Sequence, residues 1–126
     1  MNLSKVFMWA FDNETESGSA VAKGLGIKKI NHENSKFGGG PEYTVINWGS
    51  TKVSKSVLRS RIINTPTAVA RAVNKLAFFK WIGDKSRTVP WTTDPEVAKT
   101  WLQEGSKVVC RERLEGYEGQ GITIVG

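Results

Sequence analysis

The first thirty residues restrict the fold more than any other part of the sequence, because they read as strand, helix and strand joined by short turns. Residues 5–10 are apolar and suit a buried strand. Apolar side chains then recur at helical spacing over residues 17–25, and Gly26 suits the helix exit. Residues 27–30 read as a second strand. Strands that are connected through a helix run parallel, so the sequence predicts a small parallel sheet.

A third strand is expected at residues 43–47, after a glycine-rich loop at residues 31–42. Residues 54–63 are ambiguous, although their last few residues suit a strand. The 126 residues are enough for one compact domain or two very small ones.

Two helix starts in the second half carry the same signal, a capping side chain followed by proline. The first is Thr65-Pro66, after which apolar residues recur about every 3.6 positions as far as Ile82. A break in this helix is expected at Asn74, because asparagine is a good helix cap.

The second helix start is Asp94-Pro95, and Gly105 suits the end of this helix. Its apolar side chains fall on one face and are expected to be buried: Val97, Ala98, Trp101 and Leu102. Residues 106–111 and 121–125 are rich in β-branched residues and read as strands. The single cysteine, Cys110, lies in the first of these strands, where we expect it to be a small buried side chain.

Positive charge is concentrated in the middle of the chain. The net charge is +6, and residues 44–90 hold nine Lys or Arg against the single acid Asp84. Residues 1–43 are balanced, and residues 91–126 carry four basic residues against six acidic ones. Such a segment indicates an anionic partner, and nucleotide phosphates, nucleic acid and an acidic protein all qualify. No apolar run is long enough to cross a bilayer and no signal peptide is recognisable, so a cytoplasmic location is expected.

Between the last two expected strands lies a turn with three glycines in six residues: Gly116, Gly119 and Gly121. Glycine permits positive φ and lets backbone N–H groups approach a ligand closely. Successive N–H groups in such a turn form a concave site for anions. A glycine-rich hairpin without a ligand is the commoner arrangement, so the turn alone leaves both interpretations open.

The order of the elements is more specific than the turn. A capped helix carries Lys75, an extended segment and a short helix follow, and a strand that ends at Arg111 leads into the glycine turn. This succession resembles the N-terminal lobe of the ATP-grasp domain, found in carboxylate–amine and glutamate-adding ligases. Upstream, residues 32–35 and 45–50 look similar to ATP-grasp proteins of tailed bacteriophages, so the resemblance spans nearly the whole chain.

The resemblance implies two domains. Residues 1–63 would form an α/β pre-grasp domain with a small parallel sheet. Residues 64–126 would form an α+β domain, the first ATP-grasp lobe, which ends in a glycine-rich β-hairpin. The implied activity is ATP-dependent ligation of a carboxylic acid to an amine in the cytoplasm, which is the host cytoplasm if a phage encodes the chain. By position in the family motif, Lys75 and Arg111 contact the phosphates of ATP. The lid over those phosphates is formed by Gly116, Gly119 and Gly121.

Two residues depart from the family pattern. The strand cation is usually Lys, whereas Arg111 is a planar donor that can grip phosphate through two hydrogen bonds. The loop often carries a small hydroxyl residue before its middle glycine, where this chain has Glu118. A carboxylate there would repel phosphate at close range, so Glu118 either faces solvent or weakens nucleotide binding.

The second lobe of the family supplies the acidic and amide residues that hold magnesium, and it has no counterpart before Gly126. The resemblance therefore implies Mg²⁺ only where a second lobe is supplied. The chain is then either a fragment of a longer ligase, whose basic segment attracts an acidic substrate, or a shortened relative without catalysis. Two alternatives are a non-enzymatic phage protein whose basic segment binds a host protein or nucleic acid, and a nucleotide sensor. Apolar surface on a half-formed pocket would favour a homo-oligomer.

Overall fold

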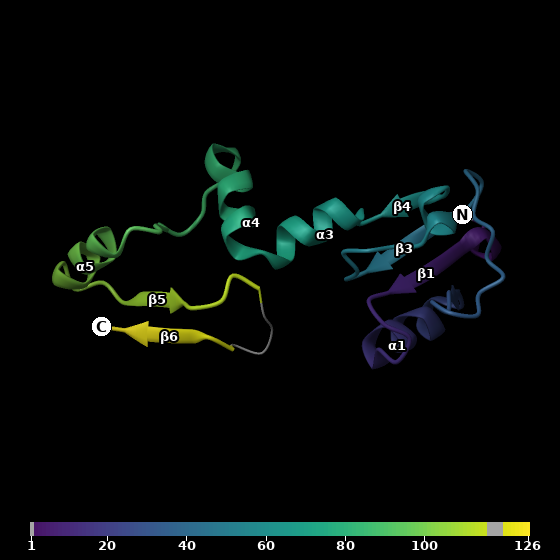
Figure 1. Ribbon diagram of the computed structural model, residues 1–126, viewed down its shortest axis with the longest axis horizontal. Helices are drawn as coiled ribbons and strands as arrows, with labels where there is room; N and C mark the ends of the chain where they lie inside the picture. The colour runs from purple at the N-terminus through teal and green to yellow at the C-terminus, as the bar shows by residue number, and fades with distance from the viewer. Residues whose placement is uncertain (1, 116–119) are drawn as a thin grey trace. The chain divides into compact units, whose positions relative to one another are not determined.

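The computed structural model describes residues 2–115 and 120–126, and it divides into two units, residues 1–70 and 71–126 (Figure 1). The sequence analysis placed the corresponding boundary between residues 63 and 64. In the structure the division falls inside a helix, α3 (Pro66–Val73).

The N-terminal unit is built on a four-stranded parallel sheet in the order β2-β1-β3-β4. The predicted parallel sheet is thus confirmed. Its fourth strand, β4, comes from the segment that the sequence left ambiguous. The strands are β1 (Val6–Ala10), β2 (Lys28–Lys29), β3 (Thr44–Trp48) and β4 (Arg61–Ile63).

Helices connect β1 to β2 and β3 to β4, and a loop connects β2 to β3. After a short 3₁₀ turn, η1 (Leu3–Lys5), the chain forms β1 and then α1 (Glu16–Leu25), which leads into β2. The exit of α1 is left-handed at Gly26, with φ of 66°, as the sequence predicted. The short helix α2 (Lys55–Leu58) precedes β4, and the Ser54 hydroxyl caps it by accepting a hydrogen bond from the Val57 N–H at 3.3 Å.

Two small apolar cores lie in this unit, because successive strand residues point to opposite faces of the sheet. One core joins Val6 and Met8 of β1 to the α1 side, where Ala22 and Ile27 are buried. The other core is built from Trp9, Ile30, Val45 and Val57. Met8, Val45 and Val57 have no exposed surface, so these two cores account for the stability of the sheet.

The buried side-chain amide of Asn47 links the end of β3 to the residue that follows β4. The Asn47 side chain is fully buried, and its Nδ2 donates to the Ser50 and Asn64 carbonyl oxygens, at 2.8 Å each. Its Oδ1 accepts from the Ser50 N–H at 3.0 Å. Asn47 therefore has its hydrogen-bonding groups satisfied inside the unit, which is the condition for burying a polar side chain without a large cost.

The C-terminal unit combines short helices with a two-stranded sheet. The predicted break at Asn74 is confirmed: a second helix begins after it, and the Asn74 Oδ1 accepts from the Ala77 N–H at 2.9 Å. The predicted cap at Asp94 is also confirmed, since its carboxylate accepts from the Glu96 N–H at 2.9 Å. The elements after α3 are α4 (Lys75–Ile82), η2 (Gly83–Lys85), α5 (Pro95–Gln103), β5 (Val108–Arg111) and β6 (Ile122–Val125).

Burial in the C-terminal unit corrects the sequence analysis. None of the side chains described in residues 71–126 is buried. Cys110, expected to be buried, is exposed. The helix α5 also differs from expectation, since Val97 is 38% exposed and the other three apolar side chains are only half-buried. One helix beside a single antiparallel strand pair has no second layer to enclose its apolar stripe.

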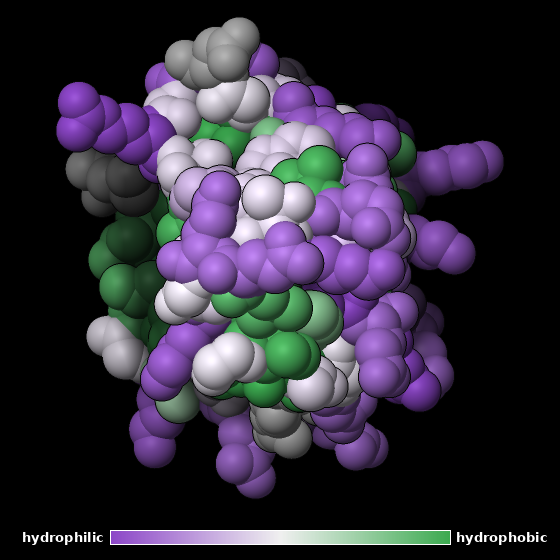
Figure 2. Space-filling model, turned by 90° about the vertical axis from the view of Figure 1, so that its left-hand side faces the viewer, coloured by the Kyte–Doolittle hydropathy of each residue, from purple (hydrophilic) through white to green (hydrophobic). Residues whose placement is uncertain are grey.

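Apolar side chains therefore reach the surface of this unit. Figure 2, which views the molecule from the side on which α5 lies in Figure 1, shows apolar groups at the surface between hydrophilic ones. Val109 and Ile124 are cross-strand partners of β5 and β6 and are 55% and 66% exposed. No helix in the part of the chain described is both long and apolar enough for a membrane span.

Candidate functional site

Lys75 is the first residue of α4 and lies directly against the segment that follows β5. Its backbone N–H donates to the Leu114 carbonyl oxygen at 2.9 Å. The Lys75 side chain is half-buried, and its Nζ donates to the Ala72 carbonyl oxygen at 3.1 Å. The start of α4 is therefore held to the base of the glycine turn by a main-chain hydrogen bond.

Arg111 is the last residue of β5, and its side chain is exposed. It pairs in register with Ile122 of β6. Leu114 lies three residues further along the chain. Since consecutive Cα atoms are about 3.8 Å apart, the Arg111 Cα lies within about 11 Å of the Leu114 Cα. The structure thus brings the backbones of the two predicted cations, Lys75 and Arg111, to the same end of the hairpin.

Of the three predicted lid glycines, Gly121 lies within the described residues. Its φ is 65°, a left-handed conformation that favours glycine. Its carbonyl oxygen accepts from the Glu112 N–H at 2.9 Å, which extends the pairing of the hairpin beyond β5 and β6. A Cβ at this position would lie 3.3 Å from the Arg113 Cγ. Gly116 and Gly119, together with Glu118, lie outside the described residues.

The charges beside the turn nearly cancel, because Arg111 and Arg113 alternate with Glu112 and Glu115. The Glu115 carboxylate faces an amide, since the Asn74 Nδ2 donates to its Oε1 at 3.4 Å. Attraction of an anion to this end of the hairpin therefore depends on Lys75, which stands at the start of α4 where the helix dipole is positive.

The donor set fits phosphate rather than a metal ion. A lysine, an arginine and backbone N–H groups are hydrogen-bond donors. Within residues 2–115 and 120–126, no group of three or more His, Cys, Asp or Glu is placed to hold a metal.

The basic segment brings cations onto an aromatic ring, which the sequence analysis did not anticipate. The Arg71 guanidinium carbon and the Lys85 Nζ lie 4.8 and 4.9 Å from the centroid of the Trp81 ring. Trp81 is 46% exposed, and nearby Trp91 stacks on Phe79 at 5.9 Å. The positions of these residues along the sequence do not indicate that their side chains meet. The contacts depend on how the chain changes direction between α3, α4 and the segment that follows.

The N-terminal unit holds a pocket that the sequence analysis also missed. The pocket lies between β1, β2 and the glycine-rich loop that precedes β3. Phe37 and Tyr43 flank the loop glycines in the sequence, which could have drawn attention to it. His32, in the same loop, packs against the sheet: its Nε2 lies 2.8 Å from the Ala10 carbonyl oxygen, and its ring stacks on the Trp9 ring with centroids 4.0 Å apart.

Comparison with known proteins gives no assignment: no protein-family model, no curated protein and no solved structure matches the chain.

Proposed function

We propose that the C-terminal unit binds the phosphates of ATP between Lys75, Arg111 and the glycine turn, as the first lobe of an ATP-grasp carboxylate–amine ligase. The observation that supports this proposal is the hydrogen bond between the Lys75 N–H and the Leu114 carbonyl oxygen. That bond ties the lysine-bearing helix start to the segment between Arg111 and the glycines. The order of motifs along the sequence supports the ligase family.

Each component has a distinct task in this proposal. Lys75 supplies a compact charge on a flexible stem, and Arg111 supplies a planar fork that matches two phosphate oxygens. At Gly121 the left-handed backbone allows main-chain N–H groups to approach the ligand closely. The described residues contain no metal-binding cluster, so the proposal concerns contacts between this chain and the nucleotide itself.

Calorimetric titration with MgATP tests the proposal. The wild-type chain is expected to bind, and a Lys75→Ala/Arg111→Ala double variant is expected to lose at least about tenfold in affinity, because charge-assisted hydrogen bonds to phosphate are among the stronger ones. A Lys107→Ala/Arg87→Ala variant removes the same residue types from exposed positions in the same unit and should bind as the wild type does. The proposal fails if the wild type does not bind or if the two double variants bind equally.

A second candidate function rests on the charges of the basic segment. The Lys99–Glu96 contact at 2.6 Å is the single ion pair among the described side chains, and it lies outside residues 44–90. None of the described acidic side chains pairs with a cation of that segment, although the Lys75 and Lys85 ammonium groups each donate to a backbone carbonyl oxygen. This arrangement favours a non-enzymatic protein whose basic segment binds nucleic acid or an acidic host protein.

Salt dependence separates this second candidate from the first. Binding to single-stranded DNA should weaken steeply as salt rises, because phosphate contacts release counterions. Retention on immobilised single-stranded DNA across a salt series measures the effect, and an Arg71→Ala/Lys85→Ala variant should elute at lower salt. Retention of an acidic polypeptide but not of DNA would assign the segment to a protein partner. Retention of neither excludes the second candidate.

A further inference from the structure

The pocket of the N-terminal unit has a volume of about 440 Å³ and is formed entirely within that unit. It opens beside β2, the edge strand of the parallel sheet, where the connection from β2 to β3 passes over β1. Its volume falls in the range of small-molecule sites, roughly 300–1,000 Å³. None of its residues belongs to the proposed phosphate site, so the inference is independent of that proposal.

Three aromatic rings form one wall of the pocket. The Phe7 ring, from the middle of β1, lies 4.8 Å from the Phe37 ring and 5.7 Å from the Tyr43 ring, measured between centroids. The Phe37 and Tyr43 rings are 5.4 Å apart and meet edge to face. All three side chains are half-buried, so each packs on its neighbours and still presents surface to the pocket. Such a wall favours a flat apolar group, because rings pack on ring edges and faces.

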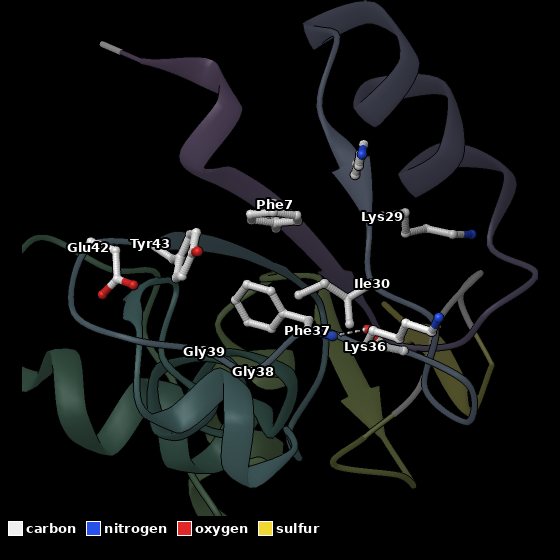
Figure 3. A pocket seen from close by; sticks show the side chains of 11 residues that line it. Phe7, Lys29, Ile30, Lys36, Phe37, Gly38, Gly39, Glu42 and Tyr43 are labelled. Atoms are coloured by element: carbon white, nitrogen blue, oxygen red, sulfur yellow. Dashed lines mark hydrogen bonds between the residues drawn. The ribbon is translucent and has the colours of Figure 1, made fainter.

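The polar groups of the pocket are segregated. Figure 3 shows Lys36 on one side and Glu42 on the other, with the rings of Phe7 and Phe37 between them. Lys28 also lines the pocket, and both Lys28 and Lys36 are exposed. Neither forms an ion pair within the part of the chain described.

Lys29 lines the same pocket, but its ammonium group forms hydrogen bonds with residues outside the pocket. Its Nζ donates to the Asn13 carbonyl oxygen at 2.5 Å and to the Ser19 Oγ at 2.8 Å. Figure 3 shows the Lys29 side chain extending away from Phe37 and Tyr43. The cationic groups available to a ligand are therefore those of Lys28 and Lys36.

The loop that carries Phe37 is held in place against the rest of the unit. Gly39 has φ of 73°, and a Cβ there would lie 1.9 Å from the Ser56 carbonyl oxygen of α2. The Gly40 N–H donates to the Ser60 Oγ at 3.3 Å, and the Tyr43 N–H donates to the Gly40 carbonyl oxygen at 3.1 Å. The loop can approach α2 this closely only because it lacks side chains at these glycines, so the aromatic wall is formed before a ligand arrives.

We propose that this pocket binds a small molecule that joins a planar apolar ring to an anionic group. The ring packs on Phe7, Phe37 and Tyr43, and the anionic group pairs with the ammonium groups of Lys28 and Lys36. Glu42 repels an anion from the other side and so fixes the direction in which the ligand lies. A carboxylate and a phosphate ester on the same ring satisfy this chemistry equally.

The first test uses indole-3-acetate and phenyl phosphate as probes of the two anionic groups. Titration of the ¹⁵N-labelled full chain should produce saturable amide shifts for at least one of them, centred on residues 35–43. Acetate lacks the ring and tryptamine reverses the charge, so both should bind at least about tenfold more weakly. The proposal is overturned if neither probe shifts these amides, or if tryptamine binds as well as indole-3-acetate.

The second test uses variants of the residues that line the pocket, and circular dichroism checks that each one is folded. Lys28→Ala/Lys36→Ala removes two exposed charges and should weaken the better probe by about tenfold or more. Lys52→Ala/Lys55→Ala removes two exposed lysines of the same unit that do not line the pocket, and should bind as the wild type does. Phe37→Leu keeps apolar bulk but removes the ring, and it should weaken the probe while leaving the wild-type pattern of amide shifts elsewhere. Equal weakening by both lysine pairs would show nonspecific charge attraction and reject the site.

Discussion

The interactions that stabilise the fold differ between the two units of this chain. Every buried side chain in the part of the chain described belongs to residues 1–70, where a parallel sheet is covered on both faces. In residues 71–126 the described side chains are half-buried or exposed, and order comes from helix caps, a hairpin and main-chain hydrogen bonds. The N-terminal unit is therefore stabilised by its own buried apolar side chains, whereas the described part of the C-terminal unit is stabilised mainly by local interactions.

This difference bears on the proposed function. A unit with little buried apolar surface opens at low free energy, and binding sites are often built in such regions. A ligand that binds only the folded form stabilises it by a free energy that rises with the logarithm of the ligand concentration over Kd. ATP should therefore stabilise the C-terminal unit far more than the N-terminal one.

The largest effect is expected from removing core volume in the N-terminal unit. Met8 has no exposed surface, so Met8→Ala should lower the free energy of unfolding by about 2–5 kcal/mol. Urea denaturation followed by circular dichroism measures the change. Leu25→Ala, at a position 46% exposed on α1, is the matched control and should cost far less. If both variants lose the same free energy of unfolding, burial of Met8 does not stabilise the N-terminal unit, and the contrast between the units is wrong.

The next largest effect concerns the buried amide. Asn47→Ala leaves the Ser50 N–H and two carbonyl oxygens without their partner, so about 1–3 kcal/mol of stability should be lost for a buried group left unsatisfied. Asn34→Ala changes the same residue type at an exposed position and serves as the control. The same denaturation experiment applies, and an unchanged midpoint for Asn47→Ala would contradict the role assigned to this side chain.

A smaller and more local effect is expected in the C-terminal unit. Asn74→Ala removes the cap of α4 and should cost about 1 kcal/mol. Hydrogen exchange should quicken in residues 75–82 and stay unchanged in β1 and β3. Asn74→Ser keeps a capping oxygen without adding a charge beside Glu115, and it should retain slow exchange. Faster exchange throughout the N-terminal unit would show that the two units do not differ in the way described.

The smallest effect is expected on the surface of the hairpin. Ile124→Ser replaces a side chain that is 66% exposed, so the free energy of unfolding should change by about 0.5 kcal/mol or less. The same change should reduce any concentration-dependent association seen by sedimentation velocity, since exposed apolar groups favour self-association. A loss of several kcal/mol would mean that Ile124 is buried in solution, which would remove the contrast between the units.

Local signals in the sequence predicted the elements well. Thr65-Pro66, Asn74 and Asp94-Pro95 marked helix ends because their side chains or rings act within one turn. The strand–helix–strand order predicted the parallel sheet for a similar reason, since the connection determines the strand direction.

Features that depend on distant contacts could not be predicted in the same way. The prediction that the apolar side chains of α5 are buried was wrong. An apolar stripe shows which face of a helix would be buried, but it does not show whether another element packs against that face. The pocket depends on Phe7 meeting Phe37 and Tyr43, which lie thirty or more positions away in the sequence. The placement of Lys75 beside Leu114 likewise comes from the fold of the unit, although the family resemblance had singled out Lys75 itself.

Hydrogen exchange with and without MgATP tests the proposed role of the C-terminal unit most directly, because it reports where the nucleotide acts. The account predicts slower exchange in residues 75–82 and 108–114 on adding MgATP, little change in residues 6–63, and no slowing in the Lys75→Ala/Arg111→Ala variant. Slowing confined to the N-terminal unit, or slowing that persists in the double variant, would contradict it.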